Sequence, residues 1–193
     1  VLFLSIPHLF DYKKKDEIIK NHLLQSYGLT INKYENIQYN SLPIPNLEIQ
    51  NVDVSIKTDL IRMKVVSLNI YPQILNIYNY KDFKTNKIIL NKNKISLSDS
   101  DLKILINYIY NLKKRLTFKN LDLNINRNST PLINLKKINF SNYGYNKNII
   151  KGKLFNKKFK ITISDNYRKL NFKLLKTGTV SYTHLRAHET LMN

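Results

Sequence analysis

Two stretches of the sequence, 69 positions apart, share one pattern of apolar and polar residues. Residues 47–56 read LEIQNVDVSI and residues 116–125 read LTFKNLDLNI. Apolar and polar residues alternate in both, as along a strand with one buried face, and the alternation slips by one position at Asn51 and at Asn120. An extra residue at such a point is typical of a β-bulge, which re-aims the side chains that follow. The repeat therefore favours an array of β-units, in which each unit buries its apolar edge on the next.

Most of the remaining chain also alternates with a period of two. Such patterns predict strands near 29–31, 37–39, 66–70, 87–97, 132–140 and 168–175, with a hairpin of 149–154 and 158–164 around Asn156. Asn91 and Asn93 occupy apolar positions of the pattern, which indicates a turn or a polar stretch there. Pro72 is a candidate first residue of a short helix over 72–79.

Two segments have the apolar spacing of helices, residues 12–27 and 99–114. Asp11 is a candidate N-cap of the first, and Gly28 a candidate for its end. Ser98 or Ser100 is a candidate N-cap of the second. The expected fold class is therefore mainly β with two helices (α+β), built on an antiparallel, repeating, solenoid-like sheet.

The composition is strongly basic, with a net charge of +19, but the charge has a simpler origin than ligand binding. Lys, Asn and Ile make up 79 of the 193 residues and Ala occurs once, which is typical of an AT-rich genome. Arg occurs five times against 27 Lys, whereas Arg is the usual choice for gripping phosphate. We therefore expect nucleic acid to be an unlikely partner.

The sequence lacks the usual patterns of catalytic and cofactor sites. The absence of Cys excludes disulfides, thiolate metal sites and Cys nucleophiles. The four Gly are scattered, and neither His8 nor His22 has a second His at ligand spacing. Asp53 and Asp122 fall on the polar sides of their strands. We expect no enzyme activity, no cofactor and no metal site.

Both ends of the chain differ from its middle. Residues 1–10 read VLFLSIPHLF, which we interpret as the end of a transmembrane helix or signal anchor, formed by Val1, Leu2, Phe3, Leu4 and Ile6. A buried strand or helix end is the alternative. Residues 179–193 contain VSYTHLRAHET, which looks like a translated sequencing adapter, and we interpret them as a non-native tail. Residues 11–178 then form one truncated β-groove domain.

Several of these segments resemble the N-terminal part of AsmA-like proteins. The similarity begins at Asp11-Tyr12-Lys13, continues through Tyr27–Ile31 and the proline-containing bend of 42–56, and returns at Arg115–Ile125. The resemblance implies an anchor in the bacterial inner membrane, a periplasmic β-groove with an apolar lining, and a role in outer-membrane biogenesis and phospholipid movement between the two membranes. It also implies phospholipid acyl chains, the inner membrane and outer-membrane assembly components as partners.

Alternation within the repeat supplies candidates for the groove lining, which are Val52, Val54, Ile56, Leu121, Leu123 and Ile125. A continuous apolar lining would shield a lipid tail that otherwise costs about 0.8 kcal/mol for each exposed CH₂ group. Two other readings remain open. One is a basic module that binds nucleic acid or an anionic membrane, and the other is a structural envelope or adhesin-like β-protein that needs no groove.

Overall fold

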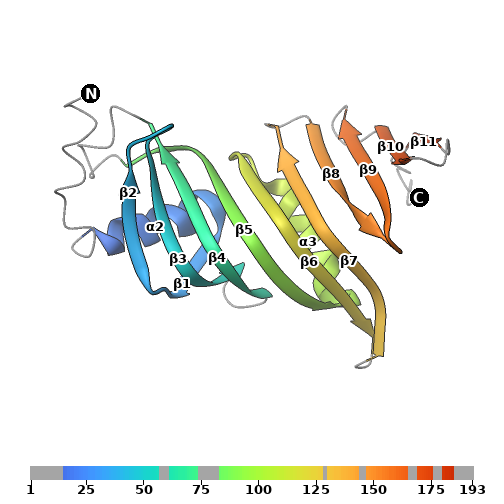
Figure 1. Cartoon of the computed structure of the whole chain (residues 1–193), viewed down its shortest axis with the longest axis horizontal. Coiled ribbons are helices and arrows are strands. Elements are labelled where there is room, and N and C mark those ends of the chain that lie inside the picture. The colour runs from blue at the N-terminus through green and yellow to red at the C-terminus, as the bar shows by residue number, and fades with distance from the viewer. Residues whose placement is uncertain are drawn as a thin grey trace, which may run out of the picture.

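The protein is built on one open, curled β-sheet with two helices on one side (Figure 1). The structure, a computed structural model, describes residues 15–56, 61–73, 83–127, 130–143, 147–164, 169–175 and 180–184. The sheet pairs in the order β1-β3-β4-β5-β6-β7-β8-β9-β10-β11, and β2 also pairs with β3. The expected mainly-β class with two helices is confirmed.

The described elements run in the following order: α2 (Asp16–Tyr27), β1 (Leu29–Lys33), β2 (Asn36–Asn40), β3 (Asn46–Ile56), β4 (Ile61–Pro72), β5 (Thr85–Ser98), α3 (Asp99–Asn111), β6 (Leu116–Arg127), β7 (Thr130–Asn142), β8 (Lys147–Leu154), β9 (Lys157–Ser164), β10 (Lys169–Leu174) and β11 (Val180–His184). Neighbouring strands are antiparallel except β5 and β6, which are parallel because α3 carries the chain back between them. The sheet is therefore mostly antiparallel, as expected, with one parallel pair.

The strands from β3 to β7 all slip by one residue along a single row that crosses the sheet. Buried positions change phase at Asn51, Val66, Lys92, Asn120 and Lys137, one on each strand. Four of these residues, all but Val66, have left-handed backbones with φ between 48° and 52°. From β3 to β6 the pairing stays in register across the row, since each strand carries the same extra residue. The phase slips predicted at Asn51 and Asn120 are confirmed. A register shift of the β-bulge kind is present at Asn120, where β6 pairs with β7, whereas β3 and β4 pair across Asn51 without one.

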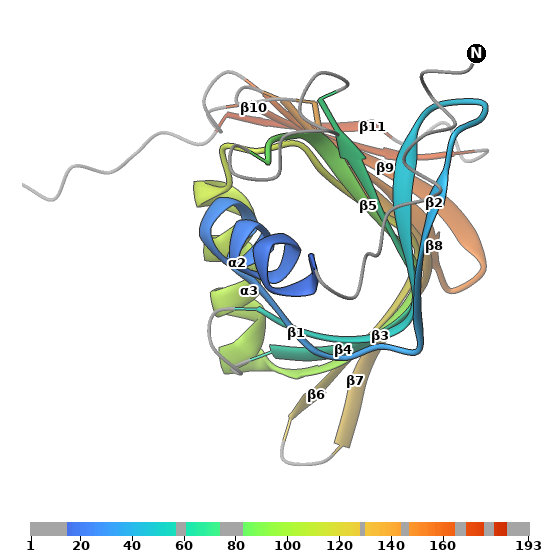
Figure 2. The ribbon, with the colours of Figure 1, turned by 90° about the vertical axis from the view of Figure 1, so that its left-hand side faces the viewer.

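This shared slip explains why the sheet curves. Bulges bend a strand and increase its local twist, so bulges aligned across neighbouring strands bend the whole sheet along one line. Figure 2 shows the strands curling around an interior, with α2 and α3 across the open side. Apolar side chains on both sides of the row point inward and form one core. The result is a trough whose long axis runs across the strands.

The two helices are held by caps and by a contact between them. Gly28 ends α2 with φ of 63°, as predicted. Ser98 starts α3 in a capping box with Asp101, also as predicted. The hydroxyl of Tyr108 on α3 donates to the backbone carbonyl of Tyr27 at 2.6 Å. Because both tyrosines are buried, this bond fixes the end of α2 against α3.

Several local predictions need correction. Lys15 occupies the N-cap of α2, and Asp11 lies outside the described residues. Pro72 ends β4 and does not begin a helix, and residues 74–82 are not described. On β4, Val66 is 49% exposed while Val65 is buried. Strand β5 runs unbroken through 91–93, so of the two alternatives there the polar stretch is confirmed and the turn is not.

The non-native tail stays a prediction. Residues 180–184 of the presumed non-native tail are described as β11, which pairs with β10 at the edge of the sheet. The predicted hairpin around Asn156 is confirmed as β8 and β9.

Candidate functional site

A row of apolar side chains crosses the inner face of nine strands. Cross-strand pairing joins each member to the next, from β2 to β10, in the order Ile37, Ile49, Leu68, Leu90, Phe118, Phe140, Ile150, Ile161 and Phe172. Directly opposite residues of paired strands lie side by side on one face of a sheet. The inner face therefore carries an unbroken apolar path along the axis of the trough.

The six predicted lining residues lie on this inner face, within the core. Val52, Val54 and Ile56 on β3 are at most 1% exposed, and Leu121, Leu123 and Ile125 on β6 are 5–8% exposed. They belong to the same cluster as the inward residues of α2 and α3. In this structure they contact protein atoms, and their role as a lipid-contacting lining stays a prediction.

The helices cover only part of the trough. Helix α2 packs against β1, and α3 packs against β5 and β6. In the part of the chain that the structure describes, no helix lies behind β8, β9 or β10 (Figure 1). The inward apolar side chains of these strands are only half-buried: Ile150, Ile161, Ile163, Leu170, Phe172 and Leu174. This end of the inner face, here called the open end, is the part that an external ligand can reach.

The sequence pattern predicts the strands of the open end, but the lining candidates came from the repeat alone and include none of its residues. Leu170, Phe172 and Leu174 alternate as clearly as the repeat does, and so do Phe159, Ile161 and Ile163. That alternation was the available signal. Cross-strand pairing of Ile161 with Phe172 then places the two patterns on one face.

Phe159 lies where the open end meets the core. Its ring is buried and stacks with that of Phe172 at a centroid distance of 6.3 Å. It also lies over Gly152, where an added Cβ would stand 3.0 Å from two ring carbons. Gly152 is therefore needed for a close approach between β8 and the aromatic ring.

A polar cluster ties α2 to the sheet beside the core. Nε2 of His22 lies 3.0 Å from Oγ1 of Thr85, and the hydroxyl of Tyr27 lies 2.8 Å from the same atom. The ring of Phe83 packs edge-on against His22 at 5.2 Å. Burial, with a smaller contribution from the positive charge of Lys114, lowers the pKa of His22 below 6.5. Each of these groups has a structural partner, so the cluster holds α2 in place.

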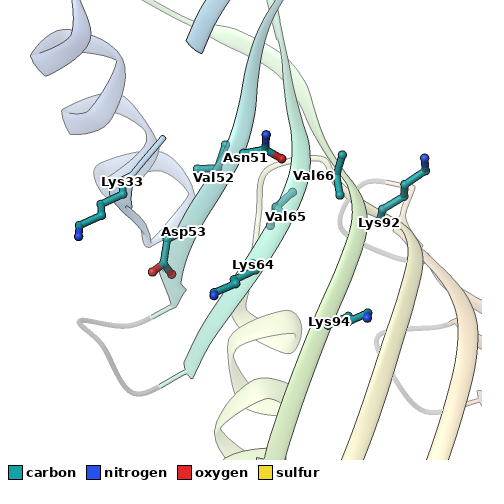
Figure 3. Close-up of a pocket in the computed structure, with 9 residues that line it drawn as sticks. All are labelled: Lys33, Asn51, Val52, Asp53, Lys64, Val65, Val66, Lys92 and Lys94. Carbon is teal, nitrogen blue, oxygen red and sulfur yellow. The ribbon is translucent and has the colours of Figure 1, made fainter. Parts of the chain in front are cut away.

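The outer face has a hollow of about 610 Å³ over β1, β3, β4 and β5 (Figure 3). Lys33, Asp53 and Lys64 are successive cross-strand neighbours, and Lys94 and Asp122 continue the row. Asp53 and Asp122 are on the polar face, as predicted, with two strands between them. Oδ1 of Asp122 accepts from the backbone N–H of Lys137 at 3.0 Å. The mixed charges of this row offset one another, and the hollow is open to solvent.

The described residues offer no metal site and no membrane-spanning helix. Within those ranges, no group of three or more His, Asp or Glu residues is placed to hold a metal ion. Neither helix described has the length and apolarity to cross a bilayer. The predicted anchor, residues 1–10, lies outside the described ranges.

Comparison of the sequence with models of protein families gives no match, and comparison with curated proteins gives none either. The inner face must therefore be interpreted from its own geometry.

Proposed function

We propose that the chain is part of a periplasmic protein of the AsmA-like kind, which conducts or scaffolds phospholipid transfer between the inner and outer membranes. Phospholipid acyl chains would lie along the inner face of the trough. A single-pass anchor in the bacterial inner membrane and contacts with outer-membrane assembly components belong to the same proposal.

The observation that carries the proposal is the unbroken apolar row that reaches an uncovered end. A soluble protein usually buries such a surface or uses it for binding. Shielding an acyl chain from water is worth about 0.8 kcal/mol for each CH₂ group, so even a short contact is favourable. Because β8, β9 and β10 are paired, the apolar row is continuous. An acyl chain could therefore move along it without meeting a polar side chain.

Lipid would reach the covered part and the open part of the trough in different ways. Helices α2 and α3 fill the trough over β1–β6, where the six residues predicted from the repeat lie. The lipid path then begins at β8 and leads away from the helices. Contact between lipid and Val54 or Leu123 would require that a helix move aside.

Site-specific photo-crosslinking tests the proposal. A crosslinker at Ile161 on β9 or at Phe172 on β10 faces the inner side of the sheet. A crosslinker at Thr162, the neighbour of Ile161 on β9, faces the outer side. With labelled phospholipid vesicles, we expect adducts at Ile161 and Phe172 and none at Thr162. Crosslinkers at Val54 and Leu123 report on the covered part. A folded protein without adducts at Ile161 and Phe172 would overturn the proposal and favour a purely structural β-protein.

A further inference from the structure

The turn between β8 and β9 places a bare aromatic side chain in solvent. Phe155 is 86% exposed and, with φ of 47°, has a left-handed backbone, as does its neighbour Asn156 with φ of 61°. Two-residue hairpin turns of this kind favour Asn-Gly, because a side chain with a Cβ disfavours left-handed conformation. Neither core packing nor turn geometry explains a Phe at this position.

Lysines surround this tip and continue along the outer face of the hairpin. Lys153 is the cross-strand neighbour of Lys158, and Lys157 follows the turn directly. Lys160 has Lys151 opposite on one side and Lys173 on the other. Like charges directly opposite each other destabilise a sheet, so this arrangement lowers the stability of the free protein.

The charge of this region is also one-sided in the sequence. Between Leu123 and His188 the only acidic residue is Asp165. The hollow on the outer face differs, since Asp53 stands between Lys33 and Lys64 there. An anionic partner would relieve the repulsion around the tip.

We propose that the β8–β9 tip docks on an anionic phospholipid bilayer, with Phe155 in the interfacial region and Lys153, Lys157 and Lys158 against the lipid phosphates. An exposed aromatic side chain flanked by basic residues is the combination that binds such an interface. Docking would also bring the open end of the trough to the bilayer, since β8 and β9 belong to both.

A bilayer fits the outer face of the hairpin better than nucleic acid does. Single-stranded nucleic acid is usually held by aromatic platforms beside basic residues. The outward side chains of β8 and β9 are lysines with Ile, Thr and Ser, and none is aromatic. The exposed aromatic residue of this hairpin, Phe155, is at the tip, where a flat membrane can receive it.

Vesicle flotation with the full chain tests the proposal. We expect binding to vesicles that contain phosphatidylglycerol and not to vesicles of phosphatidylcholine alone. Replacing Lys153, Lys157 and Lys158 together by Gln should weaken binding by roughly fivefold for each lysine lost. Phe155→Asn should weaken it by about tenfold, while the turn becomes more favourable, so lost binding would not reflect unfolding.

A matched variant separates a specific tip from diffuse charge. Replacing Lys64, Lys92 and Lys94 by Gln removes the same charge from the outer-face hollow, and we expect it to bind nearly as well as the native chain. Equal loss from both triple variants would overturn the proposal, as would binding to single-stranded DNA without binding to vesicles. Docking and lipid conduction are separate proposals. Binding to vesicles in flotation, together with no crosslinked adducts at Ile161 and Phe172, would support docking and reject conduction.

Discussion

Gly152 is the residue at which the open end tolerates least change. An added Cβ would meet the ring of Phe159 at 3.0 Å and Cγ1 of Ile138 at 3.3 Å, and both side chains are buried. Overpacking of this kind costs about 1–3 kcal/mol. We expect Gly152→Ala to lower the free energy of unfolding by that amount in urea titrations.

Two further variants define what the Gly152 result means. Thr162→Ala changes a small side chain on the outer side of β9 and should shift stability by less than about 0.5 kcal/mol. Phe159→Leu, added to Gly152→Ala, should recover part of the loss, because the shorter side chain leaves room for the methyl group. An unchanged stability of Gly152→Ala would mean that Phe159 does not lie over β8.

His22 makes the attachment of α2 sensitive to pH. Burial lowers the pKa of its imidazole below 6.5, so the folded chain binds a proton less readily than the unfolded chain does. The folded state is therefore favoured at pH above 6.5, and this contribution is lost as the pH falls through the lowered pKa. We expect the urea midpoint to decrease between pH 7.5 and pH 5.5.

His22→Gln is the matched variant for this prediction. A Gln amide can still reach Oγ1 of Thr85, which His22 contacts at 3.0 Å, but it does not titrate. The pH dependence of the urea midpoint should become shallower in this variant. Identical slopes for native chain and variant would assign the dependence to other groups.

At the scale of the strand, the bend of the trough depends on left-handed residues. Asn120 has φ of 52°, and its backbone N–H donates to Oδ1 of Asn139 at 3.2 Å. Asn tolerates this conformation, whereas a β-branched residue does not. We expect Asn120→Val to cost about 1–2 kcal/mol in urea unfolding and Asn120→Gly to cost less. Equal losses would show that side-chain contacts, not backbone conformation, decide the effect.

The sequence reveals this bend only where its alternation is clean. Asn51 and Asn120 interrupt regular apolar patterns, so both slips were predictable. On β4 the slip falls between Val65 and Val66, and two adjacent apolar residues conceal it. On β5 a polar residue, Asn93, occupies an inward position, where its Nδ2 donates to the carbonyl of Leu90 at 3.0 Å.

The apolar character of the candidate site was predictable from the sequence, but its position in the fold was not. Alternation within the repeat placed Val54 and Leu123 on one apolar face of their strands, but it did not tell which face would line a groove; the structure buries both side chains. Which strands the helices would cover could not be read from it, because that depends on contacts distant in sequence, such as Tyr108 with Tyr27. The same alternation at Ile161 and Phe172 became informative only once the sheet placed these strands beyond α3.

The whole molecule has two parts that should differ in stability. Over β1–β6 the inner face is covered by helices and forms one core with them. Neither described helix covers strands β8–β10, whose inward apolar side chains are half-buried. Regions with fewer buried apolar contacts open with a lower free energy, so their amides exchange faster with solvent.

The rate of amide hydrogen exchange should therefore vary along the axis of the trough, and it should also report on ligand binding. In water, we expect amides of β3 and β4 to be the most protected and those of β9 and β10 to exchange earlier. A ligand that binds only the folded state stabilises the region it touches by mass action. Phospholipid in excess should then slow exchange in β8–β10 and leave β3 and β4 unchanged.

Ile161→Asp places a charge in the apolar path and should abolish that protection, whereas Thr162→Asp on the outer side should retain it. Slowing that is uniform along the chain, or equal in both variants, would mean that lipid does not occupy the inner face.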